Sequence, residues 1–298
     1  MFSEPTRTAL TIAGLDPSGG AGIVADLKTF AAFRCYGAAA ITSVTFQNTQ
    51  GVFGAENQSA SSVRNQVAPI FDDFPINAVK TGMLPSREII DEIAAMAVEF
   101  GFQNFVVDPV VRSTSGYDLI DDGALRSLIT KLFPLAELVT PNAVEAERIS
   151  GLSIRSHSDV RDAARIIHDL GARAVLIKGG HLSVSDFGFG ISDWNLNIDS
   201  EDLRSIDGFR RFDSQTRNAV DFLFIDGEES RFAGEFIETT ATHGTGCTLS
   251  AAITAGLAQG KPLMEAVADA KAYVTEAIRT APMIGKGHSP VNHLVSGR

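Results

Sequence analysis

The chain of 298 residues has few cysteines and no long apolar run. Its two cysteines, Cys35 and Cys247, lack metal-type spacing, and one pair would make a poor disulfide framework. The segment Met1 to Ala9 lacks the apolar stretch of a signal peptide. Apolar runs elsewhere are broken by Gly, Asp or Pro, so no segment is long enough to span a bilayer. We therefore expect a protein of the reducing cytoplasm without a membrane partner.

Basic residues are also scarce relative to acidic ones. Lys and Arg number 25 against 36 Asp and Glu, which gives a net charge of -11. Such a surface repels a phosphate backbone, which argues against nucleic acid as the main partner. An acidic protein can still bind ATP, because that site needs only local donors and a metal ion. The 44% hydrophobic and 20% charged residues are typical of a globular chain with a substantial core.

Short β-rich runs alternate with longer helical patterns along the chain. The predicted strands are Ala9–Ala13, Ala38–Phe46, Ala78–Thr81, Phe105–Asp108, Leu138–Thr140 and Val175–Lys178. The predicted helices are Ile23–Phe33, Ser86–Phe100, Asp159–Leu170, Thr248–Ala258 and Pro262–Thr280. This alternation indicates one α/β domain over residues 1–298, with a mainly parallel sheet covered on both faces. Ligands of such sheets bind beyond the carboxyl ends of the strands.

One region departs from the pattern. Residues 183–219 are rich in Ser, Asp and Arg without a helical period, which predicts a surface insertion. The β-like runs Asp221–Ile225 and Phe232–Ile237 follow, and Asp226-Gly227 between them suggests a hairpin or tight turn.

Two glycine-rich segments lie where a strand runs into a helix. The first, Gly14 to Gly22, allows the backbone to approach a ligand closely, although a simple strand-to-helix turn explains it equally well. It lacks the Lys-Ser/Thr ending of a P-loop and the dinucleotide spacing. The second, His243 to Thr248, places successive N–H groups and a positive helix end around a predicted anion hole. Cys247 falls in its first turn, where this field favours a thiolate; the alternative is a small buried apolar residue.

Polar side chains follow three other predicted strands. Asp108, Asn142 and Glu145 offer the oxygen ligands that a hydrated Mg²⁺ prefers. A capping residue is the alternative for Glu145, and a solvated turn for Asp108. Lys178, before Gly179-Gly180-His181, could meet phosphate oxygens, or simply end its strand at a glycine turn.

The same motifs, taken in order, carry a resemblance to a known family. They are Thr11-Ile12-Ala13-Gly14, Asp16-Pro17-Ser18-Gly19-Gly20-Ala21-Gly22, Ala25-Asp26-Leu27-Lys28-Thr29, Gln47-Asn48-Thr49, Thr81-Gly82-Met83-Leu84, Asp108-Pro109-Val110, Thr140-Pro141-Asn142 with Glu145, Lys178-Gly179-Gly180-His181, His243-Gly244-Thr245-Gly246-Cys247-Thr248-Leu249-Ser250 and Pro290-Val291-Asn292-His293. Together they resemble the hydroxymethylpyrimidine/phosphomethylpyrimidine kinases of the ribokinase superfamily. The match covers nearly the whole chain apart from the insertion, and implies a ribokinase-like three-layer αβα sandwich.

The resemblance also implies roles for individual residues. It suggests Cys247 as the catalytic residue, with Gly244, Thr245 and Gly246 holding the transferring phosphate. Substrate-binding positions carried over from the family are Gln47, Gly14, Asp26 and Met83. Those for the nucleotide are Lys178, Asn142 and Thr245, and those for Mg²⁺ are Asp108 and Glu145. The Gln47 amide has both a donor and an acceptor, which suits an aminopyrimidine edge.

The implied activity is ATP-dependent phosphorylation of 4-amino-5-hydroxymethyl-2-methylpyrimidine and then of its monophosphate, in thiamine biosynthesis. Pyridoxal kinase, which acts on a similar flat ring with a hydroxymethyl group, is the alternative within the class. A catalytically silent pyrimidine-binding protein is the alternative outside it, and the joint presence of Asp108, Glu145, Lys178 and Cys247 argues against it. By analogy with the family we expect a homodimer.

Overall fold

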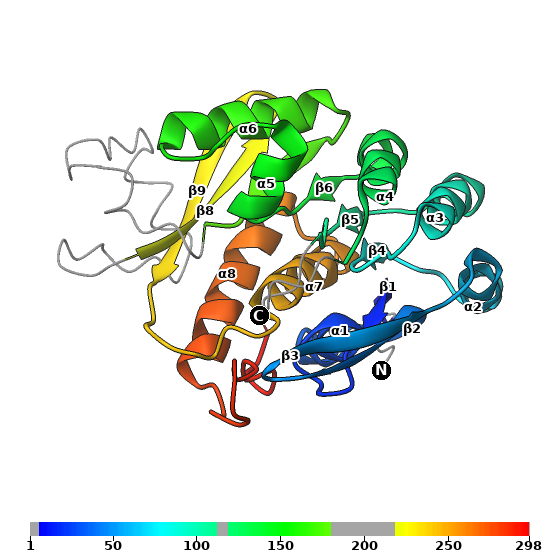
Figure 1. The fold of residues 1–298 in the computed structure, drawn as a ribbon, viewed down its shortest axis with the longest axis horizontal. Helices are drawn as coiled ribbons and strands as arrows, with labels where there is room; N and C mark the ends of the chain where they lie inside the picture. The colour runs from blue at the N-terminus through cyan, green and yellow to red at the C-terminus, as the bar shows by residue number, and fades with distance from the viewer. Residues whose placement is uncertain (1–5, 112–118, 180–217, 298) are drawn as a thin grey trace, which may run out of the picture.

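The computed structural model describes residues 6–111, 119–179 and 218–297. Within them, nine strands form one sheet in the order β3-β2-β1-β4-β5-β6-β7-β8-β9 (Figure 1). The strands are β1 (Thr8–Leu15), β2 (Tyr36–Asn48), β3 (Gly51–Asn57), β4 (Ala78–Thr81), β5 (Phe105–Val107), β6 (Leu138–Val139), β7 (Ala174–Ile177), β8 (Asn218–Ile225) and β9 (Glu228–Glu235). All neighbours from β2 to β7 pair parallel, whereas β3, β8 and β9 pair antiparallel at the two edges. The predicted mainly parallel sheet is confirmed.

Helices cover both faces of this sheet and complete the three-layer sandwich (Figure 1). One layer holds α1 (Gly22–Ala32), α7 (Thr245–Ala258) and α8 (Leu263–Arg279). The other holds α2 (Ala60–Asp73), α3 (Arg87–Glu99), α4 (Asp122–Ser127), α5 (Ala143–Ser150) and α6 (His157–Asp169), with the short turns η1 (Leu128–Leu132) and η2 (Phe133–Leu135). The αβα architecture predicted from the strand and helix alternation is therefore confirmed.

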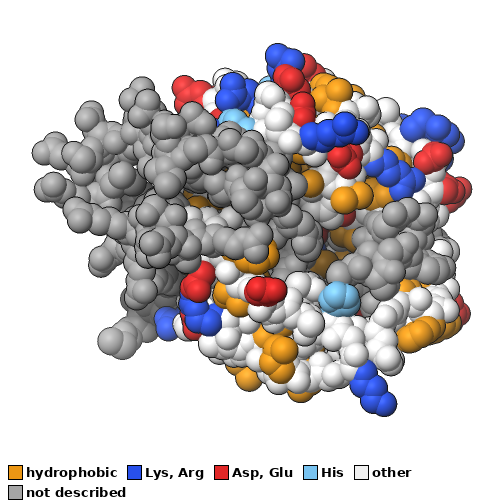
Figure 2. All heavy atoms as spheres, turned by 60° about the vertical axis from the view of Figure 1, so that its left-hand side comes forward, with side chains coloured by type: hydrophobic (Ala, Val, Ile, Leu, Met, Phe, Trp, Pro, Cys, Tyr) orange, Lys and Arg blue, Asp and Glu red, His pale blue; other side chains and the backbone are white. Residues whose placement is uncertain are grey.

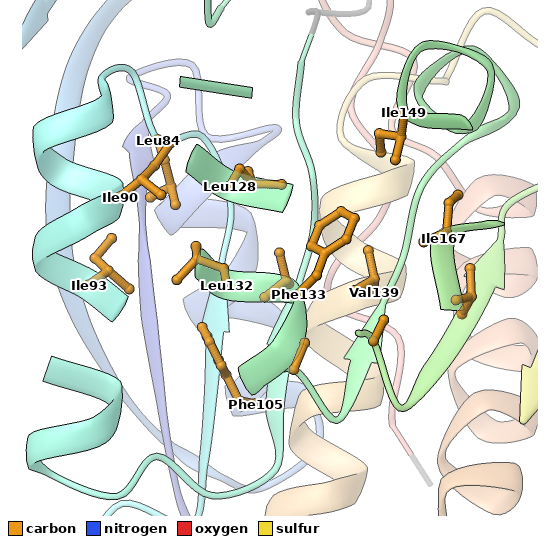
Figure 3. Packing of buried hydrophobic residues seen from close by; sticks show 14 of the residues in the cluster. Leu84, Ile90, Ile93, Phe105, Leu128, Leu132, Phe133, Val139, Ile149 and Ile167 are labelled. Carbon is orange, nitrogen blue, oxygen red and sulfur yellow. The ribbon is translucent and has the colours of Figure 1, made fainter. Parts of the chain in front are cut away.

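The core lies in two apolar clusters, one on each side of the sheet. Successive residues of a strand point to opposite faces, so Phe105 and Val107 belong to the cluster on the α3 side while Val106 belongs to the cluster on the α7 side. Figure 3 shows the first cluster, in which Leu132 and Phe133 lie between the strands and Ile93 of α3. Because the central strands β1, β4, β5, β6 and β7 are buried on both faces, they are largely apolar along their length instead of alternating.

Helix α7 is buried on nearly all sides. Every residue from Thr248 to Ala258 is buried, and the sequence there is rich in Ala, Gly, Ser and Thr. Small side chains let α7 approach the sheet while α1 and α8 pack against it. A helix apolar on all sides is expected in such an interior position, and its N-terminus is held rigidly at one edge of the sheet.

The surface carries charges of both signs. On the described part of the face in Figure 2, basic and acidic side chains are interspersed. Several of them form ion pairs, such as Arg148 with Asp122 at 3.0 Å and Arg173 with Glu137 at 2.8 Å. Exposed pairs of this kind contribute little to stability individually, so the fold depends mainly on the two apolar clusters.

The observed elements differ from the predicted ones mostly at their ends. β5, β6 and β7 each end one residue earlier, which leaves Asp108, Thr140 and Lys178 just beyond them. Helix α7 begins at Thr245, three residues before the predicted start, because Gly244 adopts a left-handed conformation that begins the helix there. Ser86 caps α3 as predicted, through its side chain and the N–H of Ile89.

Some elements have no counterpart in the prediction. β3 is an edge strand whose residues are largely exposed, so it lacks a buried apolar run. Helix α2 contains Pro69 and buries only Val63 and Val67, which weakens its helical pattern. Helix α4 has only six residues.

The predicted hairpin around Asp226-Gly227 is confirmed. Ile225 pairs with Glu228, and both turn residues have positive φ, 51° for Asp226 and 84° for Gly227. β9 therefore begins at Glu228, earlier than the predicted Phe232. Of the insertion predicted at 183–219, residues 183–217 lie outside the described residues, as do Gly180 and His181. Residues 218 and 219 belong to β8, because they pair with Glu235 and Gly234, so the insertion boundary was placed too late.

Candidate active site

The predicted functional residues lie in a row at the carboxyl ends of the parallel strands. Gly14 is the second-last residue of β1, and Thr81 is the last residue of the adjacent strand β4. Asp108, Asn142 and Lys178 come just after β5, β6 and β7, which are adjacent in that order. This is the edge at which ligands of parallel sheets bind. The predicted residues thus lie at the strand ends, as expected.

The two glycine-rich segments meet directly at this edge. Gly244 has φ 80°, and a Cβ added to it would lie 1.8 Å from the carbonyl oxygen of Gly20. A Cβ on Gly20 would in turn lie 2.3 Å from the ring of His243. Only glycine permits this contact. The Gly14–Gly22 segment is therefore more than an isolated strand-to-helix turn, because it packs directly against the segment that starts α7. The N-termini of α1 and α7 consequently face the same space.

Asp16 organises the first of these segments. Its carboxylate accepts hydrogen bonds from the backbone and hydroxyl of Ser18, at 2.8 and 2.7 Å, and from the N–H of Ala21 at 2.8 Å. It also lies 2.8 Å from Nε2 of His243, across the contact between the two segments. Burial opposes the charge, yet the bonds from His243 and Ser18 hold the pKa of Asp16 below its ordinary value. Neither Asp16 nor His243 was assigned a role from the sequence.

The start of α7 has the geometry expected for the predicted anion hole. The first N–H groups of a helix have no intrahelical acceptor, and here they belong to the small residues Thr245, Gly246 and Cys247. These three residues are partly exposed, whereas Thr248 behind them is buried. A Cβ on Gly246 would lie 3.2 Å from Nζ of Lys178, so this lysine stands directly beside the helix start. The arrangement suits a multiply charged anion.

Lys178 and Asp108 form an ion pair at this point. Lys178 Nζ lies 2.7 Å from Asp108 Oδ1, which also accepts a hydrogen bond from Thr140 at 3.1 Å. Thr140 is bonded in turn to Ser250 of α7 at 2.8 Å. Burial alone would lower the pKa of Lys178, but Asp108 and Glu145 raise it, so the lysine stays charged. Asp108 is 1% exposed, which excludes the solvated turn considered for it.

Asn142 and Glu145 form a capping box at the start of α5. Asn142 Oδ1 accepts from the N–H of Glu145 at 2.9 Å, and Glu145 Oε2 accepts from the N–H of Asn142 at 2.7 Å. The capping explanation for Glu145 is therefore confirmed. Glu145 is also buried, and this burial, with Asp108 nearby and against the attraction of Lys178, raises its pKa to about 7. A buried carboxyl beside Asp108 and Lys178 is more than a helix cap requires.

The carboxylates suit a magnesium ion bound with phosphates. In the described parts of the chain, no three His, Cys, Asp or Glu side chains are grouped to hold a metal by themselves. Mg²⁺ is ordinarily held by one or two carboxylates, waters and substrate phosphates, and Asp108 and Glu145 supply such a pair of carboxylates. The residues present therefore fit the ion when a nucleotide is bound.

The predicted substrate residues fall into two groups. Gly14 lies against Met83, whose Sδ would be 3.0 Å from a Cβ added to the glycine. Gln47 is half-buried and lies within β2, not after it as predicted, at a register shift against β3 between Phe46 and Gln47. β2 is longer than its neighbours and carries Gln47 past the end of β1, because β3 extends the pairing there. Gly14, Met83 and Gln47 remain candidates for one pocket.

Asp26, the fourth predicted substrate residue, lies in the interior and not on the surface. Its side chain is fully buried, so in this structure it offers no surface to a substrate. Asp26 Oδ2 accepts hydrogen bonds from Thr11 at 2.6 Å and from Lys80 at 2.9 Å. Lys80 is equally buried and was missed in the sequence, although a lysine inside the apolar strand Ala78–Thr81 is a visible signal.

Cys247 differs from the expectation in its protonation. Burial raises the pKa of its thiol to about 11, with Asp108 and Asp26 acting in the same direction. Lys80 and the backbone N–H of Gly22 lower the pKa, but they do not overcome the burial. These effects together favour the thiol over the thiolate in the free protein. Cys35, the other cysteine, is buried and donates to the carbonyl of Ala255, in agreement with a structural role.

Sequence comparison identifies similar proteins over nearly the whole chain. The family model described as phosphomethylpyrimidine kinase matches residues 16–292. A hydroxymethylpyrimidine/phosphomethylpyrimidine kinase of Rhizobium meliloti is 44% identical over 97% of both chains. The thiamine biosynthesis bifunctional protein ThiED of Geobacter sulfurreducens is also 44% identical, over 98% of this chain, which spans 53% of that longer protein.

Solved structures with the same fold include two kinds of kinase. A phosphomethylpyrimidine kinase of Clostridium difficile has a TM-score of 0.72 and 40% identity, covering 92% of this chain and all of that one. A pyridoxal kinase of Bacillus subtilis, solved as an ADP complex, has a TM-score of 0.79 and 34% identity over 97% and 98% of the two chains. A pyridoxal kinase of Staphylococcus aureus, solved with AMP-PCP and pyridoxal, has a TM-score of 0.78 and 32% identity over 97% and 94%. The predicted ribokinase-like fold is confirmed. In the described residues, no helix has the length and apolar character to cross a membrane.

Proposed function

The chain belongs to the phosphomethylpyrimidine kinase family, and on that premise we propose that it phosphorylates 4-amino-5-hydroxymethyl-2-methylpyrimidine and then its monophosphate. The phosphoryl donor is ATP, and the product enters thiamine biosynthesis. The observation that carries the proposal is the Lys178–Asp108 pair standing against the N-terminus of α7. A cation beside the N-terminus of a helix suits the transfer of a phosphoryl group, which depends mainly on positioning and charge stabilisation.

Each part of the site has a task in this reaction. The N–H groups of Thr245, Gly246 and Cys247 bind the transferring phosphoryl group, and Lys178 neutralises charge on the nucleotide phosphates. Asp108 and Glu145 would hold Mg²⁺, which supplies charge neutralisation to the phosphates when bound. Asn142, whose backbone pairs with Lys178, keeps the nucleotide side of the site in register.

The pyrimidine binds on the side of β1, β2 and β4. Gly14 and Met83 supply an apolar floor, and the Gln47 amide offers a donor and an acceptor to the aminopyrimidine edge. The hydroxymethyl group then points toward α7, where Cys247 accepts its proton in the thiolate form. The acceptor oxygen attacks the γ-phosphorus, the bond to the β-phosphate oxygen breaks, and ADP leaves.

Pyridoxal is the competing substrate, because two solved structures of similar fold are pyridoxal kinases. Their TM-scores exceed that of the phosphomethylpyrimidine kinase structure, whereas their sequence identities are lower. The fold alone therefore does not separate the two substrates. Residues that contact the ring decide this question, and the family model favours the pyrimidine.

The deciding experiment measures ATP turnover with the pyrimidine alcohol, its monophosphate and pyridoxal at matched concentrations. We expect the largest kcat/KM for the two pyrimidines. A larger value for pyridoxal would replace the pyrimidine with pyridoxal as the substrate, and no turnover with any of the three would overturn the kinase proposal. Repeating the assay after chelation with EDTA tests the magnesium requirement.

The compartment and the assembly belong to the same proposal. Both cysteines of the chain are free in the structure, as suits a reducing cytoplasm. We propose a homodimer by analogy with the family, and sedimentation at several protein concentrations tests it.

A further inference from the structure

An aspartate lies in the middle of an otherwise apolar stretch of β8. Its neighbours Val220, Phe222 and Leu223 are buried apolar side chains. Asp221 Oδ2 lies 2.9 Å from Nζ of Lys271 on α8, and the two side chains are only 4% and 11% exposed. An apolar pair of similar volume would often be as stable as a buried ion pair, so packing alone does not account for these charges.

The second carboxylate oxygen of Asp221 binds the backbone next to the candidate nucleotide site. Asp221 Oδ1 accepts a hydrogen bond from the N–H of Gly179 at 2.9 Å. Gly179 comes directly after Lys178, beyond the end of β7 at Ile177. A Cβ added to Gly179 would lie 1.9 Å from the carbonyl oxygen of Val220, so the chain approaches β8 closely at this point. Asp221 therefore holds the residue after Lys178 against β8.

The backbone on both sides of Lys178 is thereby fixed. The N–H of Lys178 donates to the carbonyl oxygen of Pro141 at 2.8 Å, and the next N–H, that of Gly179, donates to Asp221. From this backbone the Lys178 side chain extends to Asp108, with Nζ 2.7 Å from Oδ1, beside the start of α7. Because the course of a side chain begins at its backbone, the two hydrogen bonds determine where the ammonium lies.

The fold makes room for the lysine that holds Asp221. A Cβ added to Gly234 of β9 would lie 3.1 Å from Cε of Lys271 and 2.5 Å from Oγ1 of Thr275. β9 is the neighbour of β8 in the sheet, and α8 packs against β9. Lys271 thus passes beside a glycine of β9 to reach the carboxylate. Its ammonium takes one carboxylate oxygen and leaves the other for the N–H of Gly179.

We infer that Asp221 is a positioning residue that directs Lys178 at the phosphates of the nucleotide. The inference rests on the proposed function, because it takes Lys178 as the residue that meets those phosphates. Asp221 acts through the backbone of Gly179, and Lys271 neutralises and orients its carboxylate. A misplacement of about 1 Å can cost roughly 10²-fold in rate, so one buried hydrogen bond next to Lys178 is sufficient to affect the site.

Two double variants separate the hydrogen bond from the ion pair. The acceptor-retaining variant combines Asp221→Asn with Lys271→Met, and its amide oxygen can still accept from the N–H of Gly179. The acceptor-free variant combines Asp221→Leu with Lys271→Met, which fills a similar volume but accepts no hydrogen bond. Both lack the two charges, so the difference between them reports the hydrogen bond alone.

The measured quantity is the affinity of the full-length protein for AMP-PCP in the presence of Mg²⁺, determined by calorimetry. We expect the Kd of the acceptor-retaining variant to stay within about threefold of the wild type, and that of the acceptor-free variant to rise about tenfold or more. An acceptor-free variant that binds AMP-PCP as tightly as the acceptor-retaining one would overturn the inference.

A matched control separates this effect from a loss of stability. Leu223 lies two residues after Asp221 on the same face of β8 and is 1% exposed. Leu223→Ala should lower the melting temperature while the affinity for AMP-PCP stays as in the wild type. If Leu223→Ala weakens AMP-PCP binding as much as the acceptor-free variant does, general loosening explains the loss and the inference fails.

A further variant covers the case in which the acceptor-free protein does not fold. Asp221→Glu keeps a carboxylate for Lys271 but places its oxygens one methylene farther from the backbone of β8, so the bond to Gly179 loses its geometry. AMP-PCP binding should then weaken about tenfold while the protein remains folded. Wild-type affinity in folded Asp221→Glu would overturn the inference.

A double-mutant cycle tests whether Asp221 acts through Lys178. In a Lys178→Met background, the acceptor-free and acceptor-retaining variants should differ by less than about twofold in AMP-PCP affinity, because the side chain that Asp221 positions is absent. An equal loss with and without the lysine would overturn the positioning role. The binding assay needs no acceptor substrate. If the wild type binds AMP-PCP but phosphorylates neither pyrimidine, the proposed function fails and the role of Asp221 is still decided; if it does not bind AMP-PCP, both fail.

Discussion

Asp16 and His243, which are 227 residues apart in the sequence, are joined by a 2.8 Å hydrogen bond between Asp16 Oδ2 and His243 Nε2. The bond links the loop that starts α1 to the loop that starts α7. Both residues are buried, and the same carboxylate holds the backbone of Gly20 and Ala21. The two helix N-termini that face the candidate phosphate site are therefore fixed to each other by one side-chain pair.

Asp16→Asn should lower stability in a pH-dependent way. The pKa of Asp16 in the folded protein lies below its ordinary value of 3.8, so the carboxylate stabilises the fold above that pH. This stabilisation is lost as the pH falls through the folded-state pKa. We expect a cost of about 1–3 kcal/mol near neutral pH, shrinking below about pH 4. Melting temperatures of both proteins over a pH series measure it. A difference that does not change with pH would contradict the assignment.

Gly244→Ala should be much more damaging than its chemistry suggests. The added Cβ would lie 1.8 Å from the Gly20 carbonyl oxygen, in a backbone with φ 80°. We expect a loss of at least about 3 kcal/mol of stability, and loss of turnover, because the two loops must separate. Chemical denaturation and a turnover assay measure the two effects.

Gly101→Ala is the matched control for that change. Gly101 also has positive φ, 62°, but a Cβ there would meet nothing within 4 Å. Its cost should be the conformational one alone, about 1 kcal/mol. Equal costs for the two variants would show that the contact between the loops is not what requires glycine at 244.

The sequence was informative wherever a functional residue is marked by its local context. Asp108, Asn142 and Lys178 follow apolar strands, and parallel topology brings the ends of adjacent strands together without further information. The anion hole at α7 was visible because glycine before a run of small residues marks a helix start. These local signals were sufficient to predict the fold class and to predict that these candidate residues lie together.

Contacts between distant segments were not predictable in the same way. Asp26 and Lys80 are 54 residues apart, and nothing near either residue indicates that they pair in the core. The Asp16–His243 bond is hidden for the same reason. The helix start at Cys247 is visible in the sequence, whereas the burial that raises the pKa of its thiol depends on contacts between distant segments. Gln47 was placed after its strand because the exposed partner strand β3 was not recognised.

Gln47→Ala should weaken binding of the pyrimidine far more than that of ATP. Loss of a paired amide costs about 1–3 kcal/mol when its ligand partners are left unsatisfied. Calorimetry with each ligand measures the two affinities. Asn48→Ala is the control, since Asn48 is exposed and its side chain accepts from the N–H of Gln50 at 2.8 Å. Unchanged pyrimidine affinity in Gln47→Ala would remove Gln47 from the pocket.

Glu145→Gln should raise the magnesium requirement without unfolding the protein. The glutamine oxygen can still accept from the N–H of Asn142, so the capping box survives while the negative charge is lost. We expect the Mg²⁺ concentration for half-maximal turnover to rise roughly tenfold or more. Glu147→Gln removes a charge from the same helix and should leave the Mg²⁺ dependence unchanged. If both variants behave like the wild type, Glu145 is a helix cap and not a metal ligand.

Cys247→Ser should fold and bind both substrates but lose most of its turnover. Serine keeps the shape of the side chain, yet its hydroxyl does not ionise in the working pH range, and a general base contributes about 10²–10⁴ in rate. Cys247→Asp should retain more activity than Cys247→Ser, because a carboxylate is an ionised base at neutral pH, whereas the thiol has a pKa near 11.

The pH dependence distinguishes the wild type from the aspartate variant. With a thiol pKa of about 11 in the free protein, the thiolate fraction and hence kcat/KM should rise with pH through the neutral and mildly alkaline range. In Cys247→Asp this rise should disappear, because the carboxylate is already ionised there. Turnover of all three proteins across the pH series tests the prediction. Near-normal rates in Cys247→Ser would show that the backbone N–H groups at the start of α7 act without a base at position 247.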